Sequence, residues 1–88
     1  MIVVHTADEL RDAILQRRIA GDSVGFVPTM GALHAGHRAL LAAARQKNGF
    51  VVASVFVNPL QFGPAEDLAA YPRDRVADLA VLEAEGVD

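Results

Sequence analysis

Two apolar runs frame the centre of the chain. Residues 24–27 (Val-Gly-Phe-Val) and 50–57 (Phe-Val-Val-Ala-Ser-Val-Phe-Val) contain almost no polar side chains. Continuous runs of β-branched and aromatic residues are typical of parallel strands that are buried on both faces. We expect Pro28 to end pairing of the first strand, because proline lacks the N–H that a ladder requires. Gly31 would supply the backbone freedom of the turn that follows.

Between the two runs the apolar residues recur at helical spacing, from about Leu33 to Lys47. At 100° per residue, His34 lies one step to the side of a single stripe formed by Leu33, His37, Leu40, Leu41 and Ala44. Strand, helix and strand together predict a right-handed βαβ unit. Both imidazoles should then lie at the carboxyl end of the first strand, where open α/β sheets bind ligands.

The flanking segments predict further elements. Residues 2–4 resemble a short strand, and Thr6 and Glu9 have the spacing of a capping box for a helix to about Ala20, with Gly21 after its end. The apolar residues of that helix do not define one buried face. Asp74 is placed to cap a last helix that ends at Gly86, and residues 87–88 resemble the start of another strand. The apolar positions of this last helix are Val76, Leu79, Ala80 and Leu82.

Composition fits one small α/β domain and excludes several classes. The 88 residues are 52% hydrophobic, carry a net charge of −3 and include no cysteine. This excludes disulfides and thiolate metal sites, and it fits a cytoplasmic protein. Basic residues form no stripe that would suit nucleic acid, and no apolar run approaches a membrane span of ~20 residues. The first residues lack the features of a signal peptide.

The candidate chemistry lies in His34-Ala35-Gly36-His37 at the start of the central helix. Unpaired N–H groups and the helix dipole attract phosphate, and Gly36 would let a ligand approach the backbone. Imidazoles one turn apart can donate hydrogen bonds to phosphate oxygens, as a nucleotidyl transfer requires. Two other interpretations are a core histidine at position 37 and a zinc site, although no further ligand is evident for a metal. His5, far from this segment, is expected on the surface.

The H-x-G-H segment resembles the signature of the nucleotidylyltransferase superfamily. The longer run from Val27 to His37 (Val-Pro-Thr-Met-Gly-Ala-Leu-His-Ala-Gly-His) is similar to one family within it, the pantoate–β-alanine ligases, also called pantothenate synthetases. A second run, residues 57–67 (Val-Asn-Pro-Leu-Gln-Phe-Gly-Pro-Ala-Glu-Asp) followed by Tyr71-Pro72-Arg73, resembles the same family. Two long motifs in the right order make the resemblance specific.

This resemblance implies a Rossmann-like nucleotidylyltransferase fold, with a parallel sheet flanked by helices. It implies ATP-dependent ligation of pantoate and β-alanine through a pantoyl adenylate, with Mg²⁺ carried by ATP. His34 and His37 would be catalytic, with His37 as proton donor. Pantoate and β-alanine would contact Gln61, Asn58, Pro28 and Met30. The ATP site would be lined by Met30, Gly31, Ala32, Leu33, His34, Ala35, Gly36 and His37.

Members of this family are much longer than 88 residues, so residues 1–88 are expected to be the N-terminal part of the ATP- and pantoate-binding domain. We expect a homodimer. One alternative is another H-x-G-H nucleotidylyltransferase, which would lack the Asn58–Gln61 loop. Another is a fragment that self-associates and catalyses nothing. Asn58 and Gln61 could be ordinary turn residues. Glu66 and Asp67 could equally be helix-start charges or magnesium ligands, and Tyr71 could be packing or part of a substrate lid.

Overall fold

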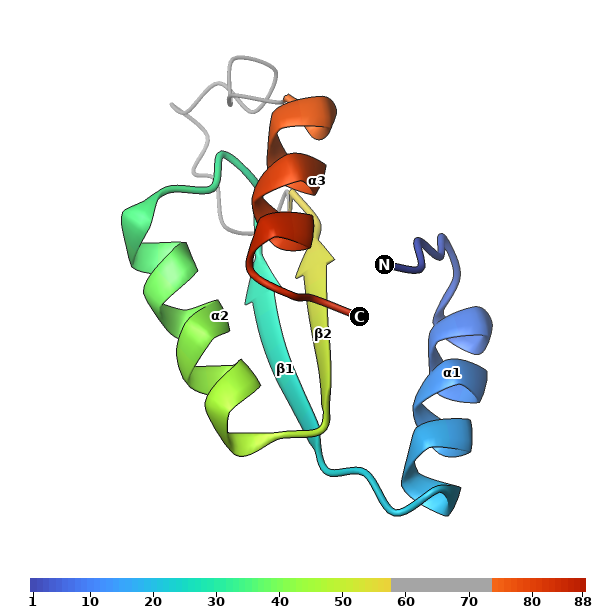
Figure 1. Cartoon of the computed structure of the whole chain (residues 1–88). Helices are drawn as coiled ribbons and strands as arrows, with labels where there is room; N and C mark the ends of the chain where they lie inside the picture. The colour runs from blue at the N-terminus through green and yellow to red at the C-terminus, as the bar shows by residue number, and fades with distance from the viewer. Residues whose placement is uncertain (58–73) are drawn as a thin grey trace, which may run out of the picture.

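The computed structural model describes residues 1–57 and 74–88, an α/β arrangement built on a two-stranded sheet (Figure 1). Asn58, Gln61, Glu66, Asp67 and Tyr71 lie outside the described residues. In the described part, no helix is long and apolar enough to cross a membrane. The elements in chain order are α1 (Ala7–Ile19), β1 (Val24–Thr29), α2 (Ala35–Lys47), β2 (Phe50–Val55) and α3 (Arg75–Ala84).

The two strands are parallel and are connected by α2, as the hydrophobic pattern predicts (Figure 1). Pairing starts at Val24 with Phe50 and continues through Pro28 with Ser54 to Thr29 with Val55. The expectation that Pro28 ends the ladder is therefore wrong. The carbonyls of Ser23 and Thr29 accept hydrogen bonds from the N–H groups of Phe50 and Phe56. The backbone N–H and C=O groups of the odd-numbered residues of β1 therefore point toward β2. Because backbone groups alternate in direction, the missing N–H of Pro28 falls on the opposite edge and no ladder bond is lost.

The core lies on the sheet face that α2 and α3 cover. Its buried members are Val27, Leu41, Val51, Leu82 and Val87, with Leu33, Ala44 and Ala53 packed against them. Gly25 sets how closely α2 approaches, because a Cβ there would lie 2.6 Å from Asn48 Nδ2 and 3.3 Å from Ala44 Cβ. The close contact between α2 and the sheet therefore depends on the absence of a side chain at this position.

The opposite face of the sheet is less covered than the sequence predicts. Phe26 is 55% exposed, so β1 is not buried on both faces within the described residues. The helix α1 has no buried residue, which agrees with its lack of a single apolar face. Its link to the sheet includes the Arg17 guanidinium, which lies 4.9 Å from the centroid of the Phe50 ring. On α2, Leu40 is 58% exposed although it belongs to the predicted stripe, whereas Leu41 is fully buried.

The predicted helix ends are confirmed, and one predicted strand is not. The Thr6 hydroxyl accepts from Glu9 N–H at 3.1 Å, and the Asp74 carboxylate accepts from Ala77 N–H at 3.0 Å. Gly21 and Gly86 both have positive φ after their helices. Residues 2–4, by contrast, form no strand. Ile2 N–H does donate to Asp88 C=O at 2.7 Å, but Ile2 and Val3 stay exposed.

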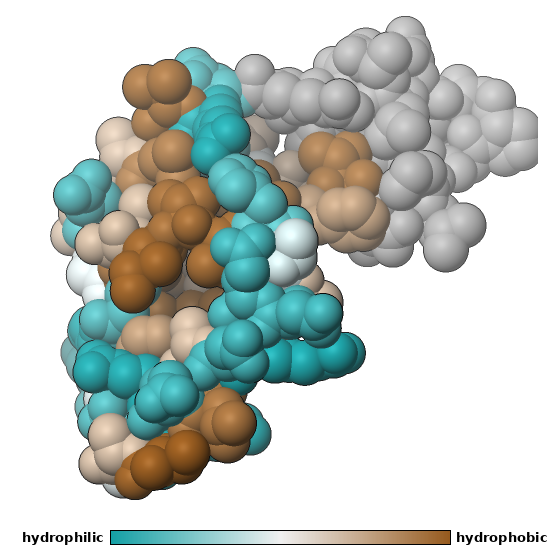
Figure 2. All heavy atoms as spheres, turned by 90° about the vertical axis from the view of Figure 1, so that its right-hand side faces the viewer, coloured by the Kyte–Doolittle hydropathy of each residue, from teal (hydrophilic) through white to brown (hydrophobic). Residues whose placement is uncertain are grey.

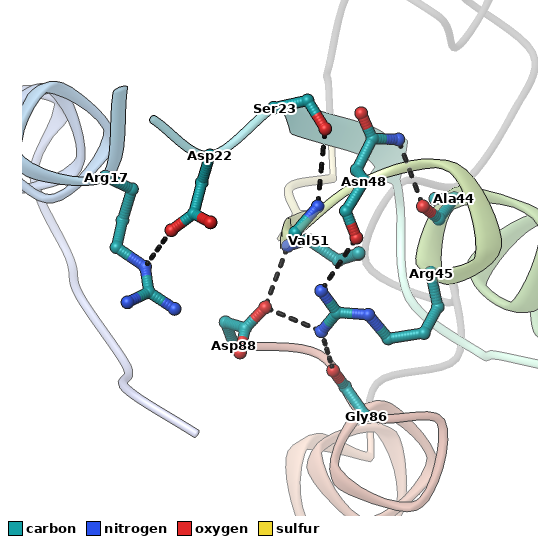
Figure 3. Close-up of polar contacts among 10 residues, drawn as sticks. Arg17, Asp22, Ser23, Ala44, Arg45, Asn48, Val51, Gly86 and Asp88 are labelled. Carbon is teal, nitrogen blue, oxygen red and sulfur yellow. Dashed lines mark hydrogen bonds and ion pairs between the residues drawn. The ribbon is translucent and has the colours of Figure 1, made fainter. Parts of the chain in front are cut away.

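The end of the described chain is fixed by a polar cluster around Arg45, shown in Figure 3. The Arg45 guanidinium contacts the Asp88 carboxylate and the Gly86 carbonyl at 2.7 and 2.8 Å, and it donates to Asn48 C=O at 3.0 Å. The same Asp88 carboxylate accepts from Val51 N–H at 2.9 Å. In addition, Asp88 N–H donates to Val51 C=O at 3.0 Å. The cluster therefore joins the end of α2, the free edge of β2 and the segment after α3.

This cluster makes stability depend on pH. Partial burial by itself would raise the pKa of the Asp88 carboxyl, but the hydrogen bond from Val51 N–H and the Arg45 guanidinium outweigh it and lower that pKa. A carboxyl with a lowered pKa stabilises the fold above its unfolded pKa and loses this effect as the pH falls through the folded value. We expect Asp88→Asn to reduce the free energy of unfolding by about 1 kcal/mol at neutral pH.

Denaturant titrations of both proteins between neutral pH and pH ~3 would measure this difference, which should be constant at neutral pH and shrink below about pH 4. The matched control is Asp8→Asn. That carboxylate also faces an arginine, but at 3.5 Å and with its side chain 92% exposed. A pH-independent difference for Asp88→Asn, or an equal effect of Asp8→Asn, would contradict the assignment.

Candidate functional site

The two histidines lie together at the N-terminus of α2, beyond the carboxyl end of β1. His34 is the N-cap residue and is exposed, and His37 in the first turn is half-buried. Their ring centroids are 4.1 Å apart, and the ring planes are inclined by 49°. The predicted placement of both imidazoles at this end of the sheet is confirmed. His37 shares the helix stripe, but its ring is not enclosed in the core.

Each imidazole accepts a backbone hydrogen bond through Nδ1. His34 N–H donates to Nδ1 of His37 at 3.1 Å, and Gly36 N–H donates to Nδ1 of His34 at 3.1 Å. A nitrogen that accepts an N–H carries no proton, so in this geometry each neutral ring has its proton on Nε2. The pair therefore presents two Nε2–H donors that the helix start itself orients.

Gly36 has a role inside this arrangement. A Cβ at position 36 would lie 2.9 Å from Cε1 and 3.2 Å from Nδ1 of His34. We expected Gly36 to leave room for a ligand, but in this structure the space is taken by the His34 ring. The absence of a side chain thus allows the N-cap imidazole to fold back onto the helix N-terminus.

The loop that leads into α2 has an unusual backbone. Gly31 and Ala32 both have positive φ, 87° and 52°. For alanine such a conformation costs on the order of 1 kcal/mol and persists only where the surroundings fix it. The Thr29 hydroxyl accepts from Gly31 N–H at 3.2 Å and donates to Ser54 C=O at 2.8 Å. The loop is therefore attached to both strands of the sheet.

Asp78 of α3 holds the other side of this loop. Its Oδ2 accepts from Ala32 N–H at 3.1 Å and its Oδ1 from Leu33 N–H at 3.0 Å. The side chain is buried, with 6% exposure. Sequence analysis missed this residue. In the sequence, Asp78 is noticeable only as an acidic residue beside Leu79, on the apolar side of the last helix. Its hydrogen-bond partners lie more than 40 residues away in the chain, so no local pattern predicts them.

These bonds limit the set of N–H groups near the helix start that are open to phosphate. Side chains of this chain already accept from the N–H groups of Gly31, Ala32, Leu33, His34 and Gly36. Two of the acceptors are the imidazoles themselves. Of these five N–H groups only that of Gly36 lies in the first turn of α2, so the donors that this geometry offers to an anion include the Ala35 N–H beside the Nε2–H groups of His34 and His37.

The remaining predicted residues are placed less closely around the histidines. Ala35 is exposed in the first turn of α2, Gly31 is buried, and Leu33 packs against the core cluster. Pro28 is exposed on the sheet face that α2 does not cover. Met30 is half-buried and, among the predicted site residues that the structure describes, is the one that lines a cleft of about 550 Å³ beside β2.

That cleft runs along the edge of β2 that faces away from β1 and is open on the side shown in Figure 2, where apolar side chains gather between polar ones. Its other walls include residues 2–5 and α3, and neither His34 nor His37 lines it. The histidine pair and the cleft are therefore separate features of the described residues, and Met30 belongs to the lining of the cleft. Among residues 1–57 and 74–88, no three His, Asp or Glu side chains form a group that could hold a metal ion.

Comparisons with known proteins agree with the two motifs. A family model described as pantoate-beta-alanine ligase matches residues 2–88. The pantothenate synthetases of Agrobacterium fabrum and Listeria innocua are 58% and 52% identical over all 88 residues. The chain spans about 30% of the length of these curated relatives.

Solved structures show the same likeness in three dimensions. The chain matches the crystal structure of pantothenate synthetase from Thermus thermophilus with a TM-score of 0.89 and 58% identity, covering 100% of this chain and 30% of that one. It also matches pantoate-beta-alanine ligase from Francisella tularensis, complexed with beta-gamma ATP and beta-alanine, with a TM-score of 0.84 and 36% identity, covering 34% of that chain. The α/β fold and the two motifs thus have one explanation: the chain belongs to the pantoate-beta-alanine ligase family.

Proposed function

We propose that residues 1–88 are the N-terminal part of the ATP- and pantoate-binding domain of an enzyme that joins pantoate to β-alanine. The pair of Nε2–H donors at the start of α2 carries this proposal. It provides two N–H donors on rings whose centroids are 4.1 Å apart, and paired donors of this kind suit the charge of a phosphate chain. The family supplies the substrates, and the Francisella relative was solved with an ATP compound and β-alanine.

In the first step, a pantoate carboxylate oxygen attacks the α-phosphorus of ATP. The new O–P bond forms as the bond from that phosphorus to the bridging oxygen breaks, so pyrophosphate leaves and pantoyl adenylate remains. Charge moves onto the pyrophosphate oxygens. The Nε2–H groups of His34 and His37 would donate to these oxygens. As proton donor to the leaving group, His37 would act from its imidazolium form, in which Nδ1 also carries a proton and does not accept from His34 N–H, and loss of the Nε2 proton returns the neutral ring.

In the second step, the amine of β-alanine attacks the acyl carbon. AMP leaves with the electron pair of the acyl–oxygen bond, the amine loses a proton, and the amide of pantothenate results. Gln61, Asn58, Pro28 and Met30 are proposed to contact pantoate and β-alanine. The position of Met30 in the lining of the cleft supports this assignment for Met30. An amide such as that of Gln61 offers donors and an acceptor to hydroxyl and carboxylate groups.

ATP is proposed to contact the segment Met30–His37, that is Met30, Gly31, Ala32, Leu33, His34, Ala35, Gly36 and His37. Mg²⁺ enters as part of the ATP substrate in this proposal. In-line transfer requires both reactants within ~3–3.5 Å, which this half of a crevice does not provide by itself. We therefore expect the remaining groups from chain segments beyond residues 1–88.

We also propose a homodimer in the cytoplasm. Exposed apolar side chains on the sheet and its ends, Phe26, Val55 and Phe56, support association, because such surface is usually covered by a partner. The absence of cysteine among 88 residues fits a reducing compartment. Association without catalysis is the rival outcome, and an exchange assay distinguishes it.

The first test measures pantoate-dependent exchange of pyrophosphate into ATP in the full-length protein. We expect His34→Ala and His37→Ala each to lower the exchange rate by roughly 10²–10³, the effect of one lost electrostatic donor. Lys47→Ala, which removes an exposed charged side chain at the other end of α2, is the matched control and should retain the rate. Loss of the cap bond at position 34 should cost only ~1 kcal/mol of stability, so both variants should remain folded.

Exchange that needs another acid in place of pantoate would indicate a different nucleotidylyltransferase. No exchange in the wild-type protein would favour the non-catalytic alternative. Wild-type rates in the double variant would remove the phosphate role of the histidines.

The second test uses Gly36→Ala. Alanine favours a helix by up to ~1 kcal/mol over glycine, so stability should hold or rise. The added Cβ nevertheless meets the His34 ring at 2.9 Å and must displace it. We expect the exchange rate to fall by about 10-fold or more through this misplacement.

Ala39→Gly, at an exposed position of the same helix, provides the opposite control. It should lower stability by ~1 kcal/mol and leave the exchange rate unchanged. Full activity of Gly36→Ala would show that the position of the His34 ring is not required.

A further inference from the structure

We propose that Asp78 is a positioning residue for the two histidines, acting through the backbone of the loop 31–33. The inference rests on the proposed function and adds a residue that lies outside the motif, although its side chain is one of those that line the cleft. Asp78 lies on α3, whereas both histidines lie on α2. The link between them is the pair of hydrogen bonds from Ala32 and Leu33 to its carboxylate.

The surroundings of the carboxylate indicate that it serves this loop. Asp78 is only 6% exposed, yet none of the ion pairs in the described residues includes it. A buried carboxylate without a cation must be compensated by hydrogen bonds to its charged form. The N–H groups of two successive residues provide that compensation, one for each carboxylate oxygen. Consecutive N–H groups in a turn form a concavity that suits an anion, and here the anion is Asp78.

The loop is shaped around the carboxylate. Gly31 and Ala32 have φ of 87° and 52°. With this backbone, the N–H groups of Ala32 and Leu33 both point at the Asp78 carboxylate on α3. A Cβ at position 31 would lie 2.9 Å from Asp78 Oδ2, so glycine is required for contact as well as for conformation. Backbone in this region does not persist without fixed surroundings, and Asp78 is the side chain that fixes it.

The position of the loop is passed directly to the histidines. Leu33 N–H is bound by Asp78, and the next residue, His34, donates its own N–H to Nδ1 of His37. A shift of the loop therefore moves the His34 backbone and the acceptor geometry of the His37 ring together. Arg38 of α2 also forms an ion pair with Glu85, the C-cap residue of α3, at 2.7 Å. This contact does not involve the loop.

Asp78→Asn tests this role in the full-length protein. An amide has one acceptor oxygen, so it cannot bind both N–H groups, and its NH₂ would face one of them. We expect the maximal rate of pantoate-dependent exchange to fall by roughly 10–100-fold. The matched control is Asp74→Asn on the same helix, which keeps a capping side chain and should retain the rate.

A merely structural role would give a different pattern in a double-mutant cycle. If Asp78 acts through the histidines, Asp78→Asn should slow a His34→Ala/His37→Ala protein by less than about threefold. Full additivity of the effects, or a wild-type rate for Asp78→Asn, would overturn the proposal. Should Asp78→Asn fail to fold, Asp78→Glu retains the charge and both oxygens but displaces the loop. We expect the same loss of rate from it, and a wild-type rate would overturn the proposal equally.

Hydrogen exchange separates this inference from the proposed function. The Ala32 and Leu33 amides should be protected in the wild-type protein and exchange at least about 10-fold faster in Asp78→Asn, while β2 amides stay protected. This result does not depend on any reaction, so it would stand even if no pantoate-dependent exchange were found. Fast exchange of both amides in the wild-type protein would overturn the proposal.

Discussion

Backbone N–H groups between β1 and α2 must find acceptors, and the way they do so determines the site. The Thr29 hydroxyl accepts from Gly31 N–H, and the Asp78 carboxylate accepts from the next two N–H groups. The imidazole of His37 accepts from His34 N–H, and that of His34 accepts from Gly36 N–H. An unpaired buried N–H costs ~1–3 kcal/mol, so this sequence of acceptors is a strong constraint on the loop. It also fixes the protons of both histidines on Nε2. The chemistry proposed for the pair is thus a consequence of how the chain satisfies its own donors.

Packing makes this constraint effective. Leu41 of α2 and Leu82 of α3 share one core with Val27 and Val51 of the sheet, so both helices are held on the same face. Gly25 allows the close approach of α2, and the burial of Leu82 keeps Asp78, one turn earlier on α3, over the loop. The Arg45–Asp88 cluster fixes the far end of the same unit. Apolar contacts therefore place the polar groups, and the polar groups orient the imidazoles.

Local sequence signals predicted much of this architecture. The apolar runs gave both strands, Thr6 and Asp74 marked helix starts, and Gly21 and Gly86 marked helix ends, because each depends on neighbouring residues only. The histidine pair followed from its spacing at a helix start. Features that depend on distant partners were missed or misjudged. Whether the missing N–H of Pro28 breaks the ladder depends on which edge of β1 pairs with β2, and the role of Asp78 depends on a loop more than 40 residues away.

The most direct test of this account is the protonation of the two rings. Long-range ¹H–¹⁵N correlation spectra of the full-length protein, labelled in histidine and recorded well above a pH of ~6.5, distinguish the tautomers of neutral imidazoles. The account predicts protonated Nε2 and unprotonated Nδ1 for both His34 and His37, since Nδ1 accepts a backbone N–H in each. A spectrum in which either ring carries its proton on Nδ1 would contradict it.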